Sequence, residues 1–241
     1  MLNVFEQFEI IKIWPLDFIL DLSLTNSGIS LCLAIFVLFF LIKSLNCFIL
    51  LKKWERIVCN VFVLIQKVLI ENMGSKGKKY FPFILSLFSF ISILNLFGTI
   101  PYNFTPTAHI IITFGFSLSI FIWITYLGLI KFKLNFFSMF LPFGCPMILG
   151  PFIIIIEFIS YCVRGITLGL RLAANITAGH LLLGIFAGFT WNIFINSFIL
   201  SILPFFLLFS ITLLEFAMGL VQAYVFTLLT VIYLNESFHP H

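Results

Sequence analysis

Long apolar runs separated by short polar stretches dominate this chain of 241 residues. The hydrocarbon core of a bilayer is about 30 Å thick, so a helix that crosses it needs about 20 mainly apolar residues. Five segments have this character, and they lie at residues 29–51, 81–100, 108–130, 152–189 and 193–234. The pattern predicts an all-α integral membrane protein whose first span is a single N-terminal transmembrane helix.

A different pattern lies between the first two spans. From Trp54 to Glu71, apolar side chains recur at helical spacing, with charged and amide side chains between them. This spacing predicts an amphipathic helix over residues 54–72 that lies on the membrane surface. The next two spans are joined by the short loop Pro101–Thr107, so residues 81–130 are predicted to form a transmembrane hairpin. Prolines and glycines between residues 142 and 151 should then break any continuous helix.

The last two apolar segments, within residues 152–234, are unusually long. At 1.5 Å per residue, each would be about 57–63 Å long as one helix, roughly twice the thickness of the hydrocarbon core. Each is therefore either a broken hairpin or an inclined helix. Two glycine pairs, Gly165 with Gly169 and Gly184 with Gly188, have a four-residue spacing that favours close helix packing more than a turn. We therefore expect two long, steeply inclined membrane helices.

Composition supports this architecture. Hydrophobic residues make up 62% of the chain and charged residues only 9%, which excludes a soluble globular domain with a charged surface. We expect a single membrane domain over residues 1–241, beginning with an N-terminal segment at residues 1–28. The five cysteines include no Cys-x-x-Cys pair, so neither a metal site nor a disulfide framework is indicated, and no cofactor is expected. The acidic N-terminus is unlike a signal peptide or an arginine-rich transit peptide.

The basic residues predict an orientation. Seven lysines and arginines lie between the first two spans and two lysines follow the third, whereas the N-terminus is acidic and the loop Pro101–Thr107 is uncharged. Because basic residues concentrate in loops on the inner side of a membrane, the N-terminus is predicted to lie outside. Five crossings then place the C-terminus inside.

Arg171 lies within one of the long apolar segments. An arginine at the centre of a membrane helix costs about 2.5–3.5 kcal/mol on insertion scales, so it is a functional-site candidate by default. Glu157, Arg164 and Arg171 are spaced seven residues apart, and seven helical steps return to nearly the same face. Asn175, four residues beyond Arg171, stays on that side, whereas His180 points to roughly the opposite face. One helix face therefore carries a carboxylate and two guanidinium groups.

The final segment repeats the spacing, since Glu215 and Gln222 are also seven residues apart. One interpretation is structural, with Arg171 in an intramembrane salt bridge to Glu157 or Glu215. Arg164 is expected to pair with Glu157 or to extend toward the membrane surface.

The remaining polar side chains, His180, Asn175 and Gln222, would individually be interpreted as hydrogen-bonded packing residues. Together the polar groups favour a function, because groups that change protonation near neutral pH flank an arginine that cannot lose its charge. This is the chemistry of a proton path with a fixed positive barrier. The alternatives are an ion-coupled secondary transporter and a structural subunit of a respiratory membrane complex. The two halves lack the matching pair of interrupted helices usual in transporters, and four histidines, two of them at the C-terminus, cannot build a pair of bis-histidine haem sites.

Two sequence blocks identify a resemblance. Residues 169–180 (GLRLAANITAGH) and 215–226 (EFAMGLVQAYVF) closely resemble subunit a of the F-type ATP synthase, especially its mitochondrial form. Residues 95–102, 104–107 and 5–9 extend the resemblance over nearly the whole chain. The resemblance implies a non-catalytic stator subunit that provides two half-channels and lies against a rotating ring of c subunits, so that proton flow drives rotation and ATP synthesis.

The resemblance also implies roles for single residues. The family's essential arginine, which faces the ring carboxylate, matches Arg171. Glu157 matches a position near the inner half-channel, and Arg164 is a candidate supporting charge, whereas His109 has no implied role. Many bacterial relatives carry an acidic residue and a histidine in the reverse order at the positions of His180 and Glu215. The positions that match the lining of the outer half-channel are Asn175, His180, Glu215 and Gln222.

The resemblance further implies partners and a location. The expected partners are the c-subunit ring, other membrane-sector and peripheral-stalk subunits of the synthase, protons and membrane lipid, with no nucleic acid. The expected location is the mitochondrial inner membrane, as a multi-pass protein, with a bacterial plasma membrane as the alternative.

Overall fold

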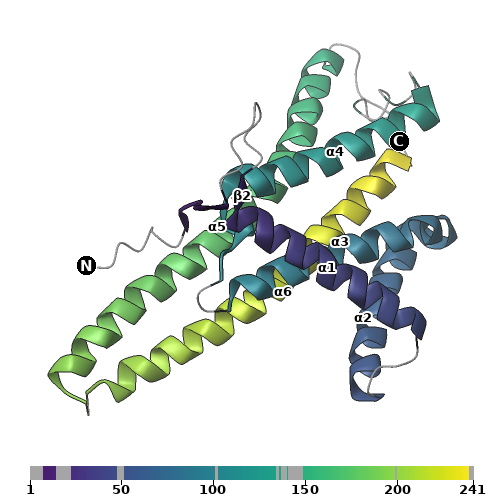
Figure 1. Cartoon of the computed structure of the whole chain (residues 1–241). Coiled ribbons are helices and arrows are strands. Elements are labelled where there is room, and N and C mark those ends of the chain that lie inside the picture. Colours follow the sequence, from purple (N-terminus) through teal and green to yellow (C-terminus); the bar gives the residue numbers. More distant parts are fainter. Residues whose placement is uncertain are drawn as a thin grey trace.

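The computed structural model describes residues 8–14, 23–47, 52–100, 103–133, 136, 140, 149–198 and 200–238. Helices form almost all of this part of the chain (Figure 1). They are α1 (Asn26–Cys47), α2 (Lys52–Met73), the 3-10 helix η2 (Gly74–Tyr80), α3 (Phe81–Gly98), η3 (Pro106–Ala108), α4 (Ile110–Phe132), α5 (Gly150–Asn196) and α6 (Ile202–Phe238). Two short strands, β1 (Lys12–Trp14) and β2 (Leu24–Thr25), pair in antiparallel fashion near the N-terminus.

Four of the described helices are long and apolar enough to cross a membrane: α3 together with the end of η2, α4, α5 and α6. A shorter apolar helix covers residues 26–39, within α1. The prediction of an all-α integral membrane protein is therefore confirmed. The crossing by residues 29–51 stays a prediction, and the predicted helix break falls mostly on residues 141–148, which lie outside the described residues.

The amphipathic helix is present as α2. Its apolar side chains Ile65, Leu69 and Met73 are buried at four-residue intervals, and α2 packs against α3 and α6 with this face. Gly74 ends the helix with a φ of 62°, a left-handed conformation that glycine adopts without the steric cost of a Cβ atom. The chain then turns through η2 directly into α3.

The two long apolar segments are each one continuous helix, so the broken-hairpin alternative is wrong. With 47 and 37 residues, α5 and α6 are about 70 and 56 Å long. They pack against each other and extend side by side beyond the other helices (Figure 1). Each greatly exceeds the thickness of a hydrocarbon core, which requires a steep inclination if it stays within the membrane.

The predicted boundary between these two segments is wrong. The hydropathy pattern predicts that the last segment begins at Ile193, but α5 continues to Asn196 and α6 begins at Ile202. The three residues between the expected segments, Thr190, Trp191 and Asn192, include neither proline nor glycine, so they do not interrupt the helix. The helix ends where Ser197 adopts an extended conformation, with φ −159° and ψ 114°.

Glycines in α5 allow α4 to approach closely. A Cβ atom at Gly165 would lie 2.9 Å from ring atoms of Phe121, and one at Gly169 would lie 2.3 Å from the hydroxyl oxygen of Ser117. The packing role predicted for this glycine pair is confirmed. At Gly188 no atom of the described chain lies within 4 Å of that position, so close packing there stays a prediction.

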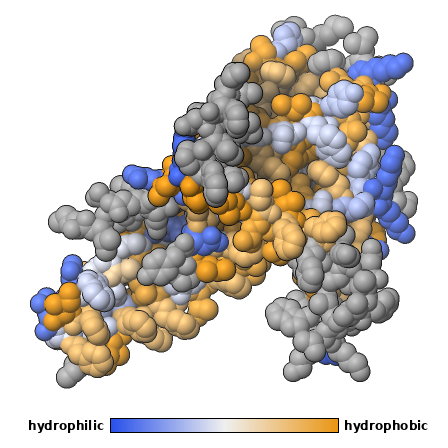
Figure 2. Space-filling view, viewed as in Figure 1, coloured by the Kyte–Doolittle hydropathy of each residue, from blue (hydrophilic) through white to orange (hydrophobic). Residues whose placement is uncertain are grey.

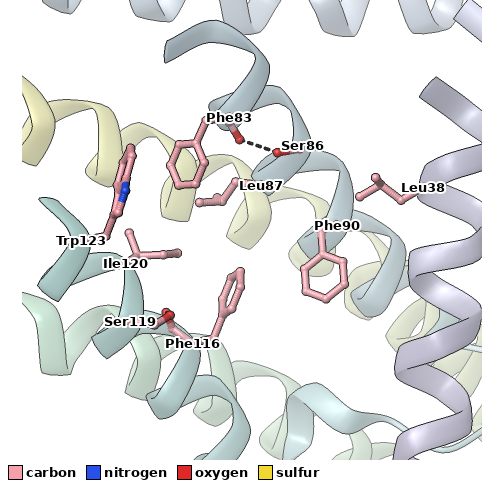
Figure 3. Close-up of a pocket in the computed structure, with 9 residues that line it drawn as sticks. All are labelled: Leu38, Phe83, Ser86, Leu87, Phe90, Phe116, Ser119, Ile120 and Trp123. Atoms are coloured by element: carbon pink, nitrogen blue, oxygen red, sulfur yellow. Dashed lines mark hydrogen bonds between the residues drawn. The ribbon is translucent and has the colours of Figure 1, made fainter. Parts of the chain in front are cut away.

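The surface has the polarity of a membrane protein. Apolar side chains cover most of the visible face, and hydrophilic side chains gather toward its two far ends (Figure 2). A cleft of about 490 Å³ opens between α1, α3 and α4 (Figure 3). Its only hydroxyls belong to Ser86 and Ser119, and both donate to backbone carbonyls of their own helices. Apart from these two hydroxyls and the indole nitrogen of Trp123, the side chains that line the cleft are apolar.

Candidate functional site

The site is built around Arg171, near the middle of α5. Its side chain lies on the exposed face of the helix, beside the exposed residues Leu170 and Ala174. Arg171 forms no ion pair with any residue in the described part of the chain. The salt bridge to Glu157 or Glu215 considered from the sequence is therefore absent. A permanent positive charge stands on a membrane-length helix without a counter-charge from the described part of its own chain.

Four polar residues, called here the His180 cluster, join α5 to α6 on one side of Arg171. Asn175 donates from Nδ2 to Oε1 of Gln222 at 3.0 Å. Nε2 of His180 lies 3.4 Å from Oε1 of Glu215. Glu215 and Gln222 are 5% and 4% exposed, so this polar contact is shielded from the surroundings on the α6 side. The structure thus brings together the four residues that the sequence grouped.

The absence of a side chain at Gly179 allows the carboxylate of Glu215 to come close to α5. A Cβ atom at Gly179 would lie 3.2 Å from both Cδ and Oε1 of Glu215. Without a side chain at this position, the carboxylate can rest against the α5 backbone beside His180. On its other side, the His180 ring meets Phe8 edge-on, with 6.3 Å between ring centroids.

A second group, called here the Arg164 cluster, lies on the other side of Arg171. Arg164 forms an ion pair with Glu236 near the end of α6, and its guanidinium carbon lies 5.7 Å from the centre of the Tyr233 ring. The expected pairing of Arg164 with Glu157 is wrong. The antiparallel course of α6 brings Glu236 beside Arg164, whereas Glu157 is seven residues, or about 10 Å, away along α5.

The spacing along α5 separates the two clusters. Arg171 is about 10 Å beyond Arg164 and about 13 Å before His180 along the helix axis. Glu157, half-buried nearer the start of the helix, adds a carboxyl group on the Arg164 side. Chemically, the arrangement offers exchangeable protons on both sides of a cation that cannot be neutralised.

The sequence did not indicate a role for Asn95, which is 1% exposed and donates from Nδ2 to the carbonyl of Gly219 at 2.9 Å. The sequence feature that could have indicated a role is the side-chain amide of this residue, because it lies inside the apolar span 81–100. His109 lies at the start of α4, where its ring stacks on Phe104 with 5.3 Å between centroids. Neither residue forms part of the two clusters by direct contact.

Comparison with known proteins gives a consistent result. The sequence profile of the family described as ATP synthase A chain matches residues 26–235. The chain is 44% identical to ATP synthase subunit a of Chondrus crispus, with 98% of this chain and 96% of the relative aligned. It is 40% identical to the proteins of that name from Metridium senile and from Marchantia polymorpha, with 98% of both chains aligned in each case.

Proposed function

The chain belongs to the ATP synthase A chain family, and from this premise we propose that it is the proton-translocating stator subunit of an F-type ATP synthase. In this proposal the exposed face of α5 around Arg171 lies against a ring of c subunits. The observation that carries the proposal is the exposed Arg171, which forms no ion pair within the described part of the chain and stands between two polar clusters. Family membership favours this function over the transporter and the respiratory-subunit alternatives.

The proposed route uses the two clusters in sequence. Protons from the outside reach a ring carboxylate through Asn175, His180, Glu215 and Gln222. After a turn of the ring they leave toward the inside near Glu157, with Arg164 and Glu236 as supporting charges. Because Arg171 stabilises a nearby carboxylate in its charged form, it favours release of the proton at the end of the turn. Its fixed charge also opposes direct passage of protons between the two clusters.

The energy comes from the membrane and not from bond chemistry in this chain. Each proton that crosses delivers about 2.3 kcal/mol per 100 mV of membrane potential, which ring rotation would transmit to the catalytic sector. We place the subunit in the mitochondrial inner membrane, since the similar proteins come from eukaryotes. The proposed role is non-catalytic, with the c ring and the other membrane-sector and stalk subunits as partners.

Replacement of Arg171 tests the proposal. In the assembled synthase, Arg171→Ala should abolish proton-driven ATP synthesis while the chain still copurifies with the c ring. Arg171→Lys should restore little, because a lysine can lose its proton in an apolar setting whereas arginine scarcely does. Arg56→Ala, which removes an exposed arginine of α2, is the matched control and should keep the parental rate. Normal synthesis by an intact Arg171→Ala complex would overturn the proposal.

A further inference from the structure

A small cavity lies where α2 meets η2 and the start of α3. Its volume is about 150 Å³. The residues that line it are Phe62, Gln66, Leu69, Ile70, Lys78 and Phe81. The first four belong to α2, whereas Lys78 comes from η2 and Phe81 begins α3. None of them belongs to the His180 cluster or the Arg164 cluster, so this cavity is separate from the site around Arg171.

The position of Lys78 beside α2 depends on the preceding glycine, Gly77. A Cβ atom at Gly77 would lie 2.2 Å from Cδ2 of Leu69 and 2.8 Å from Cβ of Met73. Because both distances are far below a normal carbon contact, η2 can lie against the buried face of α2 only with glycine here. The rings of Phe62 and Phe81 meet edge-on with 4.4 Å between their centroids, so two aromatic rings form part of the cavity wall.

The cavity lies at one end of a membrane-length helix. The candidate span of α3 covers Gly77–Gly98, so Lys78 and Phe81 stand near its beginning. On α2, Val63 and Ile70 are 54% and 42% exposed, although both are apolar. An amphipathic helix at a membrane edge lies at the boundary between lipid headgroups and acyl chains. The cavity is therefore at the depth where a phospholipid changes from polar to apolar.

The polar groups of the cavity complement an anion. Lys78 is exposed and forms no ion pair with a described residue, and no described residue hydrogen-bonds to the side-chain amide of Gln66. Glu71, at the same end of α2, already lies 3.8 Å from Nζ of Lys67. A lysine ammonium and an amide N–H can both donate to phosphate oxygens. Basic pockets between membrane helices on the predicted inner side are suited to anionic lipid headgroups.

We propose that this cavity binds one anionic phospholipid. Its phosphate accepts hydrogen bonds from Nζ of Lys78 and Nε2 of Gln66, and its glycerol part lies against Phe62 and Phe81. The cavity has the volume of about five water molecules, at about 30 Å³ each, so the acyl chains lie outside it, over the exposed apolar side chain of Ile70. A free phosphate ion would leave this apolar wall uncovered, which favours the lipid. The inference goes beyond the proposed function and does not depend on it.

Photolabelling of the assembled, purified synthase tests the site. A phosphatidylglycerol with a photoreactive group beside its glycerol should label residues 62–81, as identified by mass spectrometry. Lys78→Gln should lower this labelling roughly tenfold, because a hydrogen bond from a charged group is lost, and Lys78→Arg should keep most of it. Lys133→Gln is the matched control, since it removes an exposed lysine just after α4 that does not line the cavity. Equal labelling of the parent and Lys78→Gln would overturn the proposal.

Competition identifies the ligand. Unlabelled phosphatidylglycerol vesicles should displace the probe, whereas phosphatidylcholine vesicles and inorganic phosphate should not. Displacement by phosphatidylcholine would indicate an unselective lipid contact and displacement by phosphate a simple anion site, and either result would overturn the proposal. Gln66→Glu adds a carboxylate without a change in size and should lower labelling at least as much as Lys78→Gln.

The parental complex supplies the remaining outcome. If residues 62–81 are not labelled in the assembled synthase, another subunit covers the cavity and the proposal is wrong. None of these measurements involves proton transport, so their failure is distinct from a failure of the Arg171 variants.

Discussion

An added methyl group at Gly169 should displace the helix that carries Arg171. In a Gly169→Ala variant, Cβ would lie 2.3 Å from Oγ of Ser117, 3.0 Å from its Cβ and 3.0 Å from the backbone carbonyl oxygen of Thr113. Favourable carbon contacts lie near 3.5–4.0 Å, so α5 must move from α4 by roughly half an ångström. The carbonyl belongs to the α4 backbone and cannot rotate away as a side chain could.

The expected loss follows from this displacement. Overpacking of this kind costs about 1–3 kcal/mol of stability. Arg171 is only two residues away on the same helix and would move with it. Since a misplacement of about 1 Å can lower a rate about a hundredfold, we expect proton-driven ATP synthesis to fall roughly tenfold. Synthesis by reconstituted synthase under an imposed proton gradient measures this loss, and copurified c ring measures assembly.

Matched variants make the reasoning refutable. Gly188→Ala adds the same methyl group to α5 where no atom of the described chain lies within 4 Å, so it should leave the rate unchanged. Ser117→Gly removes two of the three close contacts, and combined with Gly169→Ala it should recover part of the lost activity. An active Gly169→Ala enzyme, or no recovery in the double variant, would show that the α4 contact does not position Arg171.

Two further predictions concern the clusters. Glu215→Gln should slow proton-driven synthesis by about a hundredfold, as expected for loss of a proton-transfer group. The double exchange of His180→Glu with Glu215→His should be more active than either of its single changes. An exchange variant no better than its worse parent would contradict the direct relay. For the half-exposed pair Arg164 and Glu236, each single charge reversal should lower the thermal stability of the purified complex by about 1 kcal/mol or more, and the double reversal should restore part of it. Equal melting temperatures for the single and double variants would rule out a stabilising ion pair.

The helices could be predicted from the sequence because hydropathy and length decide them directly. The spacing of seven residues also placed Glu215 and Gln222 on one face of their helix, and both side chains are buried in the structure. Helix periodicity is a local property, so a single sequence is enough to predict which residues share a helix face.

The contacts between helices could not be predicted in the same way. Arg164 had an acidic candidate in its own helix, but its actual partner Glu236 is set by the register of α6 against α5. That register depends on where the turn between them falls, and no proline or glycine marks residues 197–201. The bond from Asn95 to Gly219 joins residues 124 positions apart, for which spacing along one helix gives no signal.

This separation has a consequence for how the subunit is made. A growing chain emerges from its N-terminus, so α5 with Arg171 is complete before α6 is synthesised. Asn95 can form its hydrogen bond only after a residue 124 positions later has been synthesised. Arg164 can form its ion pair only after a residue 72 positions later has been synthesised. The two clusters therefore come into existence only when the last helix is inserted. Under the proposed function, a half-made chain holds the arginine but not the facing wall of α6, so it has neither of the two paths that protons would take.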